Sequence, residues 1–279
     1  MGGTTDRYIN LFTDFGFKKL FGEEPNKDLL ISFLNSLLQG KEHISQLNYL
    51  KNERLGRNEG ERKAVYDLYC SNEKGEKFII EIQRVKQEYF KDRSIYYSTF
   101  AIQEQALKGQ KWDYELKAFY MIAVLDFSFS TPEHEKFHHR VKLIEEETQR
   151  VFYDKLSFTY LEIPKFNKSI NELQSDYERW LFAFKNLHKL SDMPKELEEG
   201  IFKKLFELAE IARMQPKERF IYEDSLKDYW DLKSSMKTYF REGKEEGKKE
   251  IALAMLKEGV EIDKIVQFTG LNAQEIKSL

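Results

Sequence analysis

Residues 65–83 read VYDLYCSNEKGEKFIIEIQ and predict a β-hairpin. Aromatic, aliphatic and β-branched side chains are frequent in residues 64–70 and 77–83, and a polar segment with one glycine separates these two runs. A two-residue turn through Lys74-Gly75 would need positive φ at both residues, whereas a three-residue turn through Glu73-Lys74-Gly75 needs it at Gly75 alone. We therefore expect the three-residue turn.

This turn fixes which residues face each other across the hairpin. The expected pairs are Asn72 with Glu76, Leu68 with Ile80, Asp67 with Glu81, and Val65 with Gln83. The apolar face should be core, and it carries Tyr66, Leu68, Cys70, Phe78, Ile80 and Ile82. The other face carries Asp67, Glu81 and Gln83 and should border a site.

Asp67 and Glu81 have the chemistry of a site for a divalent metal ion. Directly opposed residues have Cβ atoms about 4.5–5.5 Å apart, so the two carboxylates would repel each other at neutral pH unless a cation lay between them. Mg²⁺ binds such oxygens and keeps several waters, one of which could become a nucleophile for phosphodiester hydrolysis. The alternative is an acidic, solvated face of a hairpin.

A family resemblance includes these residues. Asp67, the triplet Glu81-Ile82-Gln83 and a following long helix with residues 89–93 and Tyr96-Tyr97 resemble the PD-(D/E)XK nuclease superfamily. The closer resemblance is to its Rpn family of recombination-promoting nucleases and transposases. Further matching segments, which extend the likeness over nearly the whole chain, are residues 13–22, residues 105–112 and a glycine-spaced charged tail from Arg241.

The resemblance implies a metal-dependent DNA endonuclease with a restriction-endonuclease-like core, linked to recombination or mobile elements. Asp67, Glu81 and the backbone carbonyl of Ile82 would bind Mg²⁺, or Mn²⁺ in its place, and double-stranded DNA would be the substrate. Gln83 occupies the position that most of the superfamily fills with Lys, although the resembled family commonly carries Gln there. A carboxamide neither supplies positive charge nor accepts a proton as an amine does, so we expect Gln83 to orient the attacking water or the phosphate.

Other charged residues are candidates for supporting roles. Asp14 could be an additional acidic contributor or, equally, the N-cap of a helix over residues 15–21. The formal net charge is -3, so phosphate contacts would depend on local basic patches, with Lys18, Lys19 and Arg93 as candidates for nucleic-acid binding. Each basic cluster has a solvated helix face as its alternative, so charge does not decide the question.

Composition indicates a packed globular protein in 279 residues, 41% of them hydrophobic and 14% aromatic. The single cysteine, Cys70, excludes an intramolecular disulfide and a cysteine-based zinc cluster, and we expect it in the core. The sequence contains no run long enough to span a bilayer and no signal-peptide core at its start, so we expect a cytoplasmic protein without a membrane contact.

Periodicity predicts an α/β (α+β) fold with an αβββαβ core, a helical subdomain and a tail. Core elements are expected at residues 27–39 (helix), 47–57 (strand), the hairpin, 87–108 (helix), 116–125 and 156–163 (strands). Amphipathic helices follow at 172–190 and 195–213, and a third starts at Pro216 and runs toward Phe240. The expected domains are 1–166, a nuclease-like core; 167–240, a helical subdomain; and 241–279, a charged linker with a short helical tail.

The tail contains Gly243 and Gly247 among alternating charges, which predicts a marginal helix or a linker. A helix at 262–268, a stop at Thr269-Gly270 and a capping box from Asn272 to Glu275 resemble part of a helix-turn-helix. The last helix is short and has few basic residues. We therefore expect self-association, as a homo-oligomer through this region, or partner docking rather than DNA reading.

Two further functions compete with the nuclease. His134-Glu135-Lys136-Phe137-His138 is a literal H-E-x-x-H, which on a helix could bind zinc in a metallopeptidase. Lys136 beside the would-be base, Pro132 just before the motif and the lack of a clear third ligand favour a loop-to-helix surface instead. The other alternative is a nuclease-like fold that binds DNA or protein without catalysis, as the acidic net charge and Gln83 would allow.

Overall fold

The computed structural model describes residues 6–38, 43–54, 64–106, 113–129 and 135–279. The chain forms two compact units, Met1–Tyr229 and Trp230–Leu279. The predicted boundary between residues 166 and 167 stays a prediction. Parts of three predicted elements, around Gly40, Arg57 and Lys108, lie outside the described residues, as does most of the matching segment 105–112.

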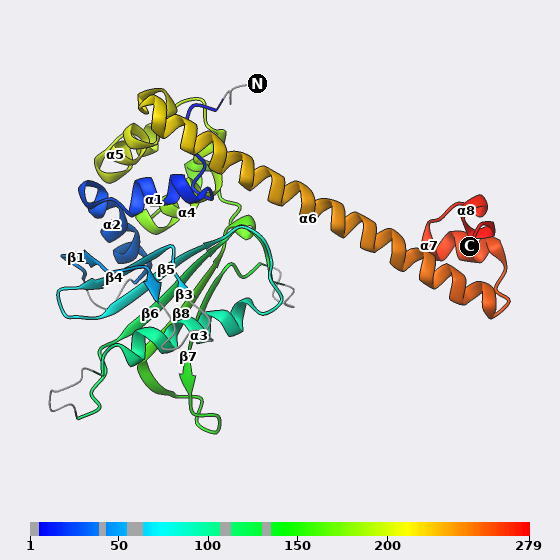
Figure 1. Ribbon diagram of the computed structural model, residues 1–279, viewed down its shortest axis with the longest axis horizontal. Coiled ribbons are helices and arrows are strands. Elements are labelled where there is room, and N and C mark those ends of the chain that lie inside the picture. The colour runs from blue at the N-terminus through cyan, green and yellow to red at the C-terminus, as the bar shows by residue number, and fades with distance from the viewer. Residues whose placement is uncertain (1–5, 39–42, 55–63, 107–112, 130–134) are drawn as a thin grey trace. The chain divides into compact units, whose positions relative to one another are not determined.

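A six-stranded mixed sheet in the order β1-β4-β5-β6-β8-β7 forms the centre of the first unit (Figure 1). Its strands are β1 (Leu47–Tyr49), β4 (Leu68–Asn72), β5 (Lys77–Gln83), β6 (Phe119–Leu125), β7 (His138–Ile144) and β8 (Val151–Glu162). β5, β6 and β8 run parallel, and β1, β4 and β7 join antiparallel. With helices α2 (Lys27–Leu37) and α3 (Phe90–Gln103), this arrangement confirms the predicted mixed α/β fold with its αβββαβ order.

The hairpin turn has the expected form. Gly75 has φ +78°, its N–H donates to the Asn72 carbonyl at 3.0 Å, and the Asn72 N–H donates to the Glu76 carbonyl at 3.1 Å. Leu68 pairs with Ile80, which confirms the predicted register within β4 and β5. Cys70 is fully buried, as expected.

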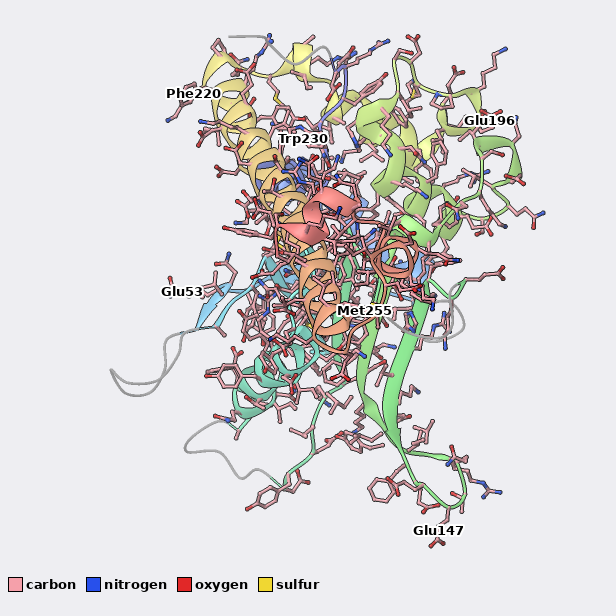
Figure 2. All side chains as sticks on the ribbon, turned by 90° about the vertical axis from the view of Figure 1, so that its right-hand side faces the viewer. Glu53, Glu147, Glu196, Phe220, Trp230 and Met255 are labelled. Carbon is pink, nitrogen blue, oxygen red and sulfur yellow. The ribbon has the colours of Figure 1, made fainter. Side chains whose placement is uncertain are left out.

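The prediction is wrong for Val65 and Tyr66, because the strand breaks before β4. Val65 belongs to β3 (Ala64–Val65), which pairs with β2 (Glu53–Arg54) in a separate two-stranded ribbon, so it faces Glu53 and not Gln83. Tyr66 packs with Tyr69 on the opposite face of the sheet from Leu68. Figure 2 marks the ribbon by Glu53 and the turn between β7 and β8 by Glu147.

Helices cover both faces of the sheet, so both faces are core. On one face lie α1 (Asp14–Phe21), α2 (Lys27–Leu37), α4 (Asp176–Asn186) and α5 (Gly200–Ala209), and on the other lies α3 (Phe90–Gln103) (Figure 1). Phe21, Phe33, Trp180 and Phe184 pack ring against ring on the first face. These four aromatic side chains are fully buried, so they are packing residues.

Several elements differ from their predicted bounds. β7 was not predicted, and β8 begins five residues earlier than residue 156, since both strands are stabilised by pairing with each other. The region of 172–213 contains shorter α-helices joined by 3-10 turns. The 3-10 segments of the described chain are Glu24–Asn26 before α2, Ile163–Lys165 after β8, and Ile170–Glu172, Leu187–Lys189, Lys195–Leu197 and Ile211–Arg213 along the helical region.

Helix α6 (Pro216–Lys257) contributes residues to both units and continues through Gly243 and Gly247 as a helix. The second unit adds α7 (Ile262–Thr269) and α8 (Ala273–Lys277) around a small core of Ala252, Ile265, Leu271 and Ile276. Gly270 ends α7 at φ +70°, and Asn272 and Glu275 form the predicted capping box. None of the helices in the described part of the chain has the length and apolar character needed to cross a bilayer.

Replacing Gly75 by Ala should lower the free energy of unfolding by about 1–2 kcal/mol, because a Cβ makes the left-handed conformation unfavourable. Chemical denaturation measures this loss. Gly75→Asn is the matched control and should lose less, since Asn tolerates this conformation better than Ala. Equal stability of the parent and the Ala variant would contradict the turn.

Candidate active site

Asp67 and Glu81 are held together where β4 begins and β5 ends. Asp67 Oδ2 accepts a hydrogen bond from the Ile82 N–H at 2.7 Å, and the Asp67 N–H donates to Glu81 Oε1 at 3.2 Å. The Asp67 side chain thus bonds to a backbone N–H of β5 just beyond the last ladder pair, Leu68 with Ile80. The two carboxylates become neighbours because a side chain continues the pairing where the strand backbone stops.

The backbone carbonyl of Ile82 lies on the same side of β5 as this pair. The N–H and C=O of one strand residue point to the same side of the strand. Since the Ile82 N–H donates to Asp67, its carbonyl points away from β6 and toward Asp67, while the Gln83 carbonyl accepts from the Asp126 N–H at 2.9 Å. Three hard oxygen donors therefore converge on one edge of the hairpin.

Both carboxylates are less acidic than usual. Burial, together with the neighbouring Asp67 charge, raises the pKa of Glu81 to about 8, although the hydrogen bond from the Asp67 N–H and the charges of Arg93 and Lys18 oppose the shift. Burial also raises the pKa of Asp67, and the Ile82 hydrogen bond partly opposes that shift. The charged forms of these two buried acids are disfavoured, and a bound cation would stabilise them.

Helix α1 brings Asp14 and Lys18 to the pair. Thr13 caps the helix by accepting from the Gly16 N–H at 3.0 Å, so Asp14 is the first helical residue and the N-cap alternative is wrong. A Cβ at Gly16 would lie 2.5 Å from the Asn10 carbonyl oxygen, so this tight entry requires glycine. Asp14 forms an ion pair with Lys18 at 2.7 Å, and its charge raises the pKa of Asp67.

A cavity of about 520 Å³ opens beside Asp67. The sequence did not assign any role at this site to helix α6, yet α6 supplies acidic residues to the cavity wall. Lys19 also lines the cavity and pairs with Glu218 of α6 at 2.7 Å. The lining residues are Asp14, Phe15, Lys18, Lys19, Gly22, Glu23, Asn52, Asp67, Leu68, Ile221, Asp224, Ser225 and Asp228.

Helix α3 approaches the pair from the other face of the sheet. Arg93 Nη2 donates to Gln83 Oε1 at 2.5 Å, and Gln83 Nε2 donates to the Val85 carbonyl at 3.0 Å. Tyr97 follows one helical turn after Arg93; burial raises its pKa, and the charges of Glu81 and Asp67 add to that shift. Tyr97 was expected only as part of the family's long helix, although its i,i+4 spacing from Arg93 places both side chains on one helix face.

Comparison with family models gives two matches. The model described as PD-(D/E)XK nuclease family transposase matches residues 11–239. The chain belongs to this family. A second model, Rpn/YhgA-like nuclease family, C-terminal HTH domain, matches residues 245–279 and assigns the chain to the Rpn group. No curated protein and no solved structure matches.

PD-(D/E)XK nucleases generally use divalent metal ions, and the donors in this member fit such an ion only in part. The described residues contain no cluster of three His, Cys, Asp or Glu side chains that could hold a metal. Asp67, Glu81 and the Ile82 carbonyl offer three protein oxygens, which suits an ion that retains several waters or takes phosphate oxygens. This donor set suits Mg²⁺ better than zinc, which prefers nitrogen and sulfur ligands.

The H-E-x-x-H motif does not form a helical face among the described residues. His134 lies outside them, residues 135–137 are not helical, and His138 begins strand β7, so the predicted loop-to-helix surface is wrong here. The His138 ring contacts the Tyr177 hydroxyl at 2.8 Å and accepts from Arg140 Nε at 3.2 Å. These contacts occupy both ring nitrogens of His138.

His138 should make stability fall in acid. Burial, followed by the electrostatic effects of Arg140, His139 and Lys136, lowers the pKa of His138 to about 4. Among the described residues, the groups hydrogen-bonded to the ring are Arg140 Nε and the Tyr177 hydroxyl. In the unfolded chain this histidine binds a proton near pH 6.5, whereas in the folded protein it does so only near pH 4. The free energy of unfolding therefore decreases as pH falls from 6.5 to 4.

Denaturation of His138→Gln across this pH range should show a flatter profile than the parent. His43→Gln, which removes an exposed histidine, is the matched control and should follow the parent profile. A His138→Gln profile as steep as that of the parent would contradict the role of this ring.

Proposed function

We propose that this PD-(D/E)XK family member is a Mg²⁺-dependent DNA endonuclease with Asp67 and Glu81 at its centre. The carrying observation is the pair of hydrogen bonds that joins Asp67 to Ile82 and Glu81 at the end of the hairpin. This bonding holds two acids side by side despite their mutual repulsion. A cation bound between the two carboxylates would remove this repulsion.

Asp67, Glu81 and the Ile82 carbonyl would hold the ion. When bound, a divalent ion supplies positive charge to the reacting phosphate and makes a water molecule a stronger nucleophile. Asp14, tied to Lys18, adds negative charge near Asp67 and is a candidate for a contact through water. Gln83, bonded to Arg93, would orient the phosphate or the attacking water at the end of β5.

Double-stranded DNA is the proposed substrate. The short last helix argued against DNA reading by the tail, but the match of residues 245–279 to a helix-turn-helix domain supports DNA binding. Lys18, Lys19 and Arg93 are the proposed phosphate contacts of the nuclease unit. We further propose a role in recombination or in the movement of mobile elements, and a homo-oligomer formed through the C-terminal helical region. Helix-turn-helix proteins that bind as dimers read two half-sites, so a dimer would suit this module.

Purified protein with Mg²⁺ or Mn²⁺ should convert supercoiled plasmid into open or linear forms, and chelation with EDTA should stop it. Asp67→Ala should reduce the cleavage rate at least about 100-fold, the scale expected when transition-state stabilisation is lost. Asp113→Ala, which removes an exposed carboxylate, is the control and should cut like the parent. Gel electrophoresis of plasmid time courses measures these rates.

Intact plasmid with the parent protein in either metal would contradict the proposal. DNA binding that is equally strong with and without metal, and without cleavage, would instead support the non-catalytic binding module. The departure at Gln83 from the superfamily's Lys is the observation that favours this second candidate.

Glu81→Gln should separate metal binding from folding. The variant replaces a buried carboxyl group whose charged form is disfavoured, so without metal it should melt at or above the parent temperature. Mg²⁺ at 100 times its dissociation constant should stabilise the parent by about 2.7 kcal/mol and the variant far less. Thermal melts with and without Mg²⁺ test this, with Glu146→Gln as an exposed control, and an equal gain in parent and Glu81→Gln would contradict the assigned ligand.

A further inference from the structure

Arg93 is fixed in place by neutral groups. Its Nη2 donates to Gln83 Oε1 at 2.5 Å and its Nη1 donates to Gln87 Oε1 at 2.7 Å. The guanidinium carbon lies 5.1 Å from the ring centre of Phe90 and 5.6 Å from that of Tyr97. Two amide oxygens and two ring faces orient the guanidinium without cancelling its charge.

Four other arginines of the first unit differ from Arg93 in this respect. Arg7, Arg179, Arg213 and Arg219 each pair with a carboxylate at 2.6–2.9 Å. For Arg93, no carboxylate within the described ranges lies at ion-pair distance, and its remaining N–H groups have no protein acceptor there. A partly buried guanidinium with its charge uncancelled is preorganised for an anion.

The amide of Gln83 is already engaged. Its oxygen accepts from Arg93, and its nitrogen donates to the Val85 carbonyl at 3.0 Å. Gln83 is 8% exposed. Its influence on a phosphate therefore passes mainly through the arginine that it holds. Lys18, another cation near the carboxylates, is paired with Asp14 at 2.7 Å and is less available.

We propose that Arg93 is a catalytic residue that contacts the reacting phosphate, and that Gln83 is the positioning residue that aims it. Helix α3 thus supplies the positive charge that a Lys at position 83 would supply from β5. This inference rests on the proposed endonuclease function. Negative charge increases on the phosphoryl oxygens during cleavage, and a fixed guanidinium stabilises that charge without having to reorganise.

Single-turnover plasmid cleavage in Mg²⁺ tests the assignment with Arg93→Met, which keeps the stem and removes the charge. The cleavage rate should fall about 100- to 1000-fold, the range seen when one fixed donor to the transition state is removed. Arg213→Met, which removes an exposed guanidinium paired with Glu210, is the matched control and should cut at the parent rate. Gln83→Lys in the Arg93→Met background should recover at least about tenfold, since a cation returns to the same place.

A second readout needs neither metal nor cleavage. Fluorescence anisotropy of a labelled duplex in EDTA, at a series of salt concentrations, gives the slope of log K against log salt. Arg93→Met should reduce the size of this slope by about 0.9, which corresponds to one lost phosphate contact. Arg93→Lys keeps the charge and should keep the parent slope. If Arg93→Met melts at a lower temperature than the parent, Arg93→Lys replaces it in the cleavage assay, where a smaller loss of rate is expected.

The outcomes separate this inference from the function on which it rests. If the parent cuts, Asp67→Ala does not, and Arg93→Met cuts at the parent rate or keeps the parent salt slope, the assignment of Arg93 is overturned and the endonuclease stands. If the double variant Gln83→Lys, Arg93→Met is as inactive as Arg93→Met alone, the claim that Arg93 supplies the charge of a Lys at position 83 is overturned. If the parent itself leaves DNA intact with either metal, the proposed function and this inference are both overturned.

Discussion

The hydrogen bond from the Ile82 N–H to Asp67 Oδ2 is the contact on which the candidate site depends. It extends the pairing of β4 and β5 beyond Leu68 with a side chain in place of a backbone carbonyl. The same bond brings the Asp67 carboxylate toward Glu81 and leaves the Ile82 carbonyl on their side of the strand. Val65 and Tyr66 are not part of the pairing with β5, so the strand breaks before Asp67. At this break, the oxygen donors of Asp67, Glu81 and Ile82 come together.

That cluster carries an electrostatic cost that the surrounding helices partly offset. Burial raises the pKa of both Asp67 and Glu81, and the nearby charges of Asp14 and of Asp67, respectively, add to these shifts. Lys18 from α1 and Arg93 from α3 oppose the shift from the two faces of the sheet, but neither bonds directly to the pair. The protein therefore keeps two acids poorly neutralised at one edge, while Arg93 has no carboxylate partner among the residues that the structure describes. A divalent ion would neutralise the two acids, and a phosphate would pair with Arg93.

The hairpin could be predicted from sequence because its determinants are local. Gly75 selects the turn, the turn sets the register, and alternation separates Glu81 from Ile80 and Ile82. The features that escaped prediction depend on contacts distant in sequence: β7 is defined by its pairing with β8, and α6 reaches the cavity 150 residues or more after Asp67. The bond between Arg93 and Gln83 needs α3 to lie across the sheet, which neither residue's neighbours specify.

Anomalous diffraction from crystals of the full chain soaked in Mn²⁺ tests the central claim most directly, because it locates the ion without relying on activity. We expect one peak at roughly 2–2.5 Å from oxygens of Asp67, Glu81 and the Ile82 carbonyl. A peak at another cluster, or an empty hairpin edge at saturating Mn²⁺, would contradict the account.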